Sequence, residues 1–137
     1  VYAARGSNFV TSMLRLMAGG EEVRVVADQL GTPTHAASLA RATWAMTAGG
    51  ARGLRHFTDA GVASRYDFAV AIGEEAQSLG LLNGPRTVTP IATADYPTPA
   101  QRPPCSILDA SATWAATGGP PRHWRADEET PGTNREE

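Results

Sequence analysis

Apolar residues along the first third of the chain change from helical spacing to a continuous run and back again. The side chains that recur at intervals of three and four residues predict a helix over residues 8–18, with Ser7 as its N-cap. The apolar run at residues 23–27 predicts a strand, and a long alanine-rich helix is expected over residues 35–48. The stripe of the first helix consists of Phe9, Val10, Met13, Leu14 and Met17.

The pattern repeats in the second third of the chain. Residues 54–58 alternate in polarity, which predicts a short strand in which His56 is a hydrogen-bonded core histidine. The sequence Ser64-Arg65-Tyr66-Asp67 resembles a capping box and opens a helix that ends near Leu79. Residues 86–92 predict another strand, which Pro90 restricts to an edge or a terminus. Strands and helices in alternation favour an α/β fold.

A polar turn, Asp28-Gln29-Leu30-Gly31-Thr32-Pro33-Thr34, separates the strand at 23–27 from the alanine-rich helix. We expect Gly31 to adopt backbone angles that a residue with a Cβ resists, and Pro33 fixes its own φ. Such a rigid turn is a good place for ligand contacts. The alternative, purely structural interpretation is a well-capped connection between a strand and a helix.

Three features could converge on a phosphate-bearing ligand: Asn8 near a helix N-terminus, the turn at 28–34, and Arg102 in a proline-rich loop. Helix N-termini attract anions, and a guanidinium matches phosphate oxygens with two bonds. Prolines around Arg102 reduce the freedom that the loop loses on binding. The alternative is that Arg102 pairs with a local carboxylate such as Asp95.

Composition excludes several classes of function. All 12 basic residues are arginine, so no mechanism that needs a lysine can run on this chain alone. A net charge of -2 gives no reason to expect nucleic acid or a membrane surface as partner. No apolar run is long enough to cross a membrane. The single Cys105 excludes an internal disulfide and suits the cytoplasm, which is our prediction for its location.

The sequence contains no recognisable catalytic constellation or metal site. The three histidines lie in different predicted elements, with no metal-ligand spacing between them, so no metal is predicted. Glu74-Glu75 is read as a solvated helix face rather than an acid–base pair. The glycines at 49–53 follow a helix and precede a strand, which is the reverse of a dinucleotide-binding loop.

The ends of the chain are unusual. The chain begins with Val1 rather than Met, which suggests that it starts inside a larger protein. The acidic tail, residues 126–137, has no apolar side chain larger than Ala, and we expect it to be disordered. Residues 1–125 then form the folded portion.

Several motifs in order resemble the dTDP-4-dehydrorhamnose reductase family, a group of extended short-chain dehydrogenases. The turn and the proline-rich loop are the most specific of them. The similarity extends to about Trp124. The motifs are Gly6-x-Asn8-Phe9, Val25-Val26-Ala27-Asp28-Gln29-x-Gly31-x-Pro33-Thr34, His56-Phe57-Thr58-Asp59-Ala60-Gly61, Tyr66-Asp67-Phe68-Ala69 and Tyr96-Pro97-Thr98-Pro99-Ala100-x-Arg102-Pro103.

The resemblance implies the C-terminal part of such an enzyme: a substrate-binding domain plus the last strands of a Rossmann sheet. In this family NADPH or NADH is bound by an N-terminal Rossmann domain, and hydride passes to the C4 ketone of dTDP-4-dehydro-L-rhamnose with a Tyr and a Lys as catalytic pair. Those features would lie before Val1, so no catalytic residue is assigned here. The resemblance places Asn8, Asp28, Gln29, Thr34 and Arg102 near the dTDP-sugar, and a homodimer is expected of the full-length protein.

Three functional hypotheses follow. The first is a fragment of the reductase that binds the dTDP-sugar and is inactive alone. The second is a non-catalytic relative, similar to the regulatory subunit of methionine adenosyltransferase, whose role is to bind a partner. The third is another nucleotide-sugar reductase or epimerase, which would differ in the sugar that it recognises.

Overall fold

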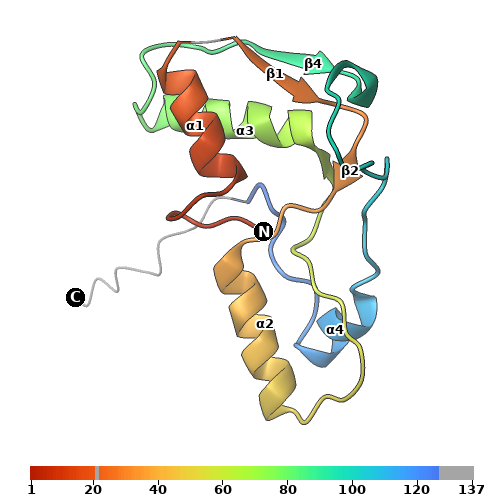
Figure 1. Ribbon diagram of the computed structural model, residues 1–137. Coiled ribbons are helices and arrows are strands. Elements are labelled where there is room, and N and C mark those ends of the chain that lie inside the picture. Colours follow the sequence, from red (N-terminus) through yellow and green to blue (C-terminus); the bar gives the residue numbers. More distant parts are fainter. Residues whose placement is uncertain (21, 127–137) are drawn as a thin grey trace, which may run out of the picture.

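The structure, a computed structural model, describes residues 1–20 and 22–126. Its packed part is a two-stranded parallel sheet with two helices beneath it (Figure 1). The strands run in register from the pair Val23 and Val88 to the pair Val26 and Ile91. The elements of this layer are α1 (Phe9–Ala18), β1 (Val23–Val26), α3 (Arg65–Ser78) and β4 (Val88–Ile91).

Two helices, α2 (Ala36–Ala48) and α4 (Ser111–Ala116), lie on the other side of the chain's first residues and extend away from the sheet (Figure 1). A second, very short sheet of two antiparallel strands, β2 (Leu30–Gly31) and β3 (Ala63–Ser64), connects the two regions. The 3-10 turn η1 (Thr93–Asp95) directly follows β4 and stays beside the parallel sheet. The described chain is therefore a mixed α/β fold, as the sequence predicts.

The hydrophobic core lies between α1, α3 and the parallel sheet. Met17 is fully buried there, and a Cβ added to Gly73 of α3 would lie 3.4 Å from its Sδ, an ordinary van der Waals distance. An alanine could therefore be accommodated at this position of α3. The core cluster consists of Met13, Met17, Val23, Val25, Ala69, Ile72, Ala76 and Leu82.

Local capping sets the starts of α1 and α3. Asn8, rather than the predicted Ser7, is the N-cap of α1: its side chain accepts a hydrogen bond from the Thr11 amide, and the Thr11 hydroxyl accepts one from the Asn8 amide. The predicted capping box of Ser64 and Asp67 is confirmed, since each side chain accepts a hydrogen bond from the other's backbone N–H.

The start of α2 is held by residues distant in sequence, because His35 makes no side-chain cap. The buried carboxylate of Asp59 accepts a hydrogen bond from the His35 amide through Oδ2 at 2.7 Å. Negative charge at this end of a helix is favourable. On the other side of His35, the amide of Tyr2 donates to the Thr34 carbonyl, and the Ala36 amide donates to the carbonyl of Tyr2.

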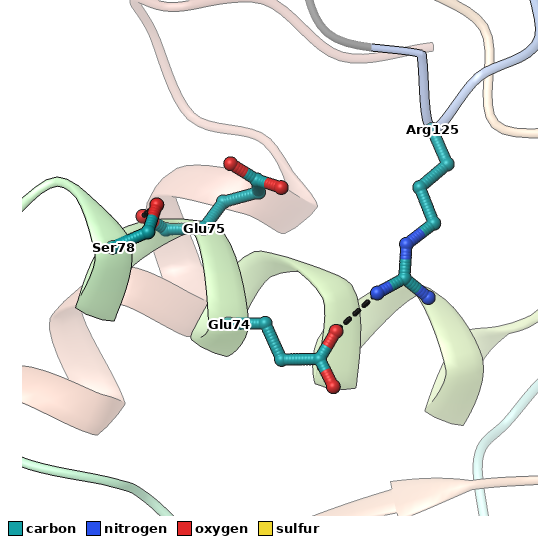
Figure 2. Close-up of polar contacts among 4 residues, drawn as sticks. All are labelled: Glu74, Glu75, Ser78 and Arg125. Carbon is teal, nitrogen blue, oxygen red and sulfur yellow. Dashed lines mark hydrogen bonds and ion pairs between the residues drawn. The ribbon is translucent and has the colours of Figure 1, made fainter.

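The last described residues return to the body of the protein. The Ala60 amide donates to the Arg122 carbonyl, and the Trp124 amide donates to the Ala60 carbonyl. Gly61, with φ of +91°, lies directly under the His123 ring, so a Cβ there would collide with it. Arg125 forms an ion pair with Glu74 of α3 (Figure 2), but both side chains are half exposed, so the pair stabilises little.

The predicted strand at 54–58 is wrong: among the described residues no backbone group pairs with this segment, and Leu54 is 84% exposed. His56 is likewise exposed rather than a core histidine. An alternating pattern makes a strand only when another strand pairs with it.

The predicted strand at 86–92 is present but shorter, with Pro90 opposite Val25. Apart from Ala126, the predicted disordered tail lies outside the described residues.

We predict that Met17→Ala destabilises the fold by about 2–5 kcal/mol, because it leaves a cavity between α1 and α3 that backbone shifts fill only partly. Leu16→Ala is the matched control: Leu16 is the neighbouring residue and is 39% exposed, so its loss should cost far less. Urea unfolding of the two variants measures the difference. Equal losses would contradict the core described above.

Candidate functional site

A cavity of about 310 Å³ lies where three segments distant in sequence meet. The turn after β1, the junction of β3 and α3, and the end of the proline-rich loop each contribute side chains, while Phe9 and Phe68 form an apolar wall. The two rings are stacked with their centroids 5.5 Å apart. The remaining lining residues are Val1, Tyr2, Gln29, Leu30, Gly31, Thr32, Pro33, Ala63, Ser64, Arg65, Arg102, Pro103 and Ser106.

β2 brings these segments together, because this strand pairs on both edges. On one edge the Leu30 amide donates to the Pro104 carbonyl at 2.8 Å, and the Leu30 carbonyl accepts from the Ser106 amide at 2.9 Å. On the other edge β2 pairs with β3, with Leu30 opposite Ser64. The loop end and the start of α3 are therefore fixed on either side of the same two-residue strand.

Gly31 contributes to the site for a reason other than the predicted one. Its φ is not in the left-handed region, which corrects the expectation of unusual backbone angles. A Cβ at this position would lie 3.1 Å from the Ser106 hydroxyl oxygen, tighter than most real contacts. Glycine here allows the loop end to approach β2 closely.

Asp28 anchors the turn to the exit of β4. Its carboxylate accepts hydrogen bonds from the hydroxyl of Thr93 at 2.6 Å and from the Thr93 amide at 3.0 Å. These bonds favour the charged form and hold the pKa of Asp28 below its ordinary value. The Gln29 side-chain amide donates to the same Thr93 hydroxyl at 3.0 Å, so one threonine holds two residues of the turn.

Of the five side chains predicted to contact a ligand, Gln29 and Arg102 line the cavity. The other three have structural partners and do not line it: Asn8 caps α1, Asp28 binds Thr93, and Thr34 is buried with its hydroxyl donating to the Thr32 carbonyl. Direct ligand contact by any of the five stays a prediction.

Arg102 does not pair with Asp95, the local carboxylate considered as its alternative partner. Within the described residues no ion pair joins Arg102 to Asp95, whose carboxylate instead accepts a hydrogen bond from the Ala92 amide. Arg102 is exposed at the cavity with no carboxylate partner among those residues.

Sequence reasoning missed Arg65 and Ser106 as cavity residues. Ser106 is brought there by the backbone pairing of Leu30, which no local pattern announces. Arg65 could have been singled out from the sequence. It is the first residue of the predicted helix α3, where a cation is disfavoured by the helix dipole.

The described part of the chain offers no cluster of metal ligands, since no three His, Cys, Asp or Glu side chains there lie close enough together to hold a metal ion. Glu74 and Glu75 do not converge, since Figure 2 shows Glu75 pointing away from the pair made by Glu74 and Arg125. None of the described helices has the length and apolar character needed to cross a membrane.

A nicotinamide cofactor does not fit the residues present. Its diphosphate requires a glycine-rich loop between a strand and a helix N-terminus. In this chain the glycines at 49–53 follow α2 and lead into the irregular segment around Leu54, with no strand before them.

Comparison with known proteins decides the family. The profile described as "RmlD substrate binding domain" matches residues 1–130. The chain belongs to this family. The dTDP-4-dehydrorhamnose reductase of Mycobacterium tuberculosis CDC 1551 is 42% identical over 123 residues, which cover 88% of this chain and 38% of that protein.

Solved structures support the same family assignment. A crystal structure of dTDP-4-dehydrorhamnose reductase from Bacillus anthracis in complex with NADP superposes with a TM-score of 0.79 at 31% identity, over 90% of this chain and 42% of that one. The Clostridium acetobutylicum orthologue gives 0.77 at 35% identity, over 91% and 43%. The chain thus spans about two-fifths of the length of these members of the RmlD substrate-binding family.

We predict that acid weakens the fold through Asp28. Because its pKa is lowered in the folded state, its contribution to stability is complete at neutral pH and is lost as the pH falls from about 4 through the folded pKa. Asp28→Asn should lower the free energy of unfolding at pH 7 and flatten its dependence on pH in acid. Urea unfolding at a series of pH values measures both.

Thr93→Val serves as the control, because it removes the hydroxyl partner and keeps the carboxylate. It should flatten the acid dependence partially, since the Thr93 amide still donates to Asp28. If Asp28→Asn keeps the pH dependence of the unchanged chain, the link between the turn and β4 contributes nothing to stability.

Proposed function

We propose that this chain forms the dTDP-sugar-binding part of a dTDP-4-dehydrorhamnose reductase, which reduces the C4 ketone of dTDP-4-dehydro-L-rhamnose to dTDP-L-rhamnose. The observation that carries the proposal is the cavity that joins Arg102 and Gln29 to an aromatic wall, in a chain of the RmlD substrate-binding family. The family relatives named above are reductases acting on this sugar nucleotide, which favours this proposal over a regulatory subunit.

The chemistry of the cavity suits a nucleotide sugar. The Arg102 guanidinium can donate two parallel hydrogen bonds to phosphate oxygens. The Gln29 amide can both donate and accept, as recognition of a base or of sugar hydroxyls requires. Tyr2 and Phe9 each pack against Phe68, with ring centroids 5.2 Å and 5.5 Å apart, and this wall offers apolar area to a flat ring.

Catalysis is proposed to depend on residues outside these 137. The sequence contains no lysine, so it cannot supply the Tyr and Lys pair of the family, and its glycines do not form a dinucleotide loop. NADP is bound in the Bacillus anthracis relative. We propose that NADPH or NADH is held by the part of the reductase that this chain does not include. A homodimer and a cytoplasmic location stay predictions.

We predict that the chain binds dTDP in isothermal titration calorimetry and that Arg102→Gln weakens this binding about tenfold or more, since a charged hydrogen bond to phosphate is lost. Arg24→Gln is the control, because Arg24 is an exposed arginine of β1 that does not line the cavity. Titration with UDP and GDP under the same conditions tests which nucleobase the site prefers.

The outcomes separate the hypotheses. Preference for dTDP supports the reductase, and preference for UDP or GDP supports another nucleotide-sugar enzyme. Absence of binding to all three nucleotides would contradict a nucleotide-sugar site and favour a partner-binding role.

We also predict that the purified 137 residues do not oxidise NADPH in the presence of dTDP-4-dehydro-L-rhamnose, measured by absorbance. A full-length reductase of the family, assayed in parallel, shows that the substrate is competent. Turnover by the chain alone would overturn the proposal that its catalytic groups lie elsewhere.

A further inference from the structure

We propose that Arg65 and Arg102 act as a two-arginine clamp in which each guanidinium binds one phosphate of the nucleotide diphosphate. This inference rests on the proposed function and adds to it a second cation, Arg65, from a different element. Arg65 is the first residue of α3, whereas Arg102 lies in the proline-rich loop.

The backbone places the two arginines on opposite sides of one strand. β2 pairs on one edge with β3, whose last residue, Ser64, immediately precedes Arg65. On its other edge Leu30 pairs with the segment around Cys105, shortly after Arg102. Both side chains line the same cavity. Main-chain hydrogen bonds therefore hold in place the two backbone segments that carry the arginines.

The charges around the cavity leave both guanidinium groups available. Neither the Arg65 nor the Arg102 guanidinium forms an ion pair or side-chain hydrogen bond with another described residue, and no described Asp or Glu lines the cavity. Two arginines that face one cavity without a carboxylate make a region of positive potential. A diphosphate, with two adjacent charged groups, matches this arrangement better than a single phosphate does.

The position of Arg65 in its helix supports a role beyond structure. The first turn of a helix favours acidic residues, and α3 has Asp67 in that turn for its capping box. A cation at the first position is locally unfavourable and receives no compensating partner within the described chain. Local rules are usually broken in this way at functional sites. The ordinary alternative is that Arg65 is a solvated surface charge, which predicts no effect on binding.

The experiment is calorimetric titration of the chain with dTDP and with dTMP, for the unchanged sequence and for Arg65→Gln, Arg65→Lys and Arg24→Gln. We expect Arg65→Gln to weaken dTDP binding about tenfold and dTMP binding much less, so that the preference for the diphosphate collapses. Arg65→Lys should retain more of this preference than Arg65→Gln, because it keeps the positive charge but loses the two parallel hydrogen bonds that a guanidinium can donate. Arg24→Gln should change neither. Circular dichroism confirms that each variant is folded.

The results distinguish failure of the clamp from failure of the proposed function. If the chain binds dTDP and Arg65→Gln keeps both the affinity and the preference over dTMP, the clamp is overturned and the proposed function stands. If the chain does not bind dTDP, inorganic pyrophosphate is titrated instead. Binding of pyrophosphate that depends on Arg65 then supports the clamp without the nucleotide, and absence of that binding overturns both.

Discussion

The arrangement of this protein depends on the backbone of one residue, Leu30. Its amide and carbonyl are both used by the loop end at 104–106, while the two-residue strand that it begins also pairs with β3. Backbone hydrogen bonds on both edges leave little freedom for the three segments that meet there. Gly31 makes the close approach of Ser106 sterically acceptable. The cavity and its arginines exist because these main-chain bonds form.

The two regions of the described chain are held together by different forces. Around β1 and β4, apolar side chains from α1 and α3 form one continuous core, which is the part that hydrophobic burial stabilises. By contrast, Ala42 is the only buried residue of α2, and Trp44 on the same helix is 76% exposed. Polar contacts hold parts of that region to one another, such as Asp59 to the His35 amide and the Trp114 indole N–H to the Thr58 carbonyl. The cavity lies beside the packed region, where Phe9 and Phe68 belong to helices that pack on the core.

The polar residues of the motif Asp-Gln-x-Gly-x-Pro-Thr have different roles. Asp28 binds Thr93, and Thr34 is buried beside the start of α2. Gln29 lies between these two and faces the cavity while also bonding Thr93. A turn exposes backbone and side-chain groups that must find partners before any can serve a ligand. Most of the polar side chains in this motif therefore hold the turn in shape, and Gln29 is the one of these three that also lines the cavity.

The sequence by itself determined the elements whose causes are local. Helical spacing and a capping box place α1 and α3 within a few residues of their observed ends, because these interactions join residues three or four apart. The apolar run of β1 and the lone free cysteine could likewise be interpreted without coordinates. Two members of the candidate site, Gln29 and Arg102, were found from the motifs that carry them.

Only the tertiary structure decided what depends on pairing between distant segments. Residues 54–58 alternate like a strand yet have no backbone partner among the described residues, so they are irregular and His56 is exposed. Arg65 reaches the cavity of Arg102 because β2 pairs on both edges, across separations of more than thirty residues. The close approach that favours glycine at 31 comes from Ser106, 75 residues later, and not from the φ of Gly31. Such contacts cannot be predicted from local sequence patterns, because loop closure and strand pairing depend on residues that are far apart in the chain.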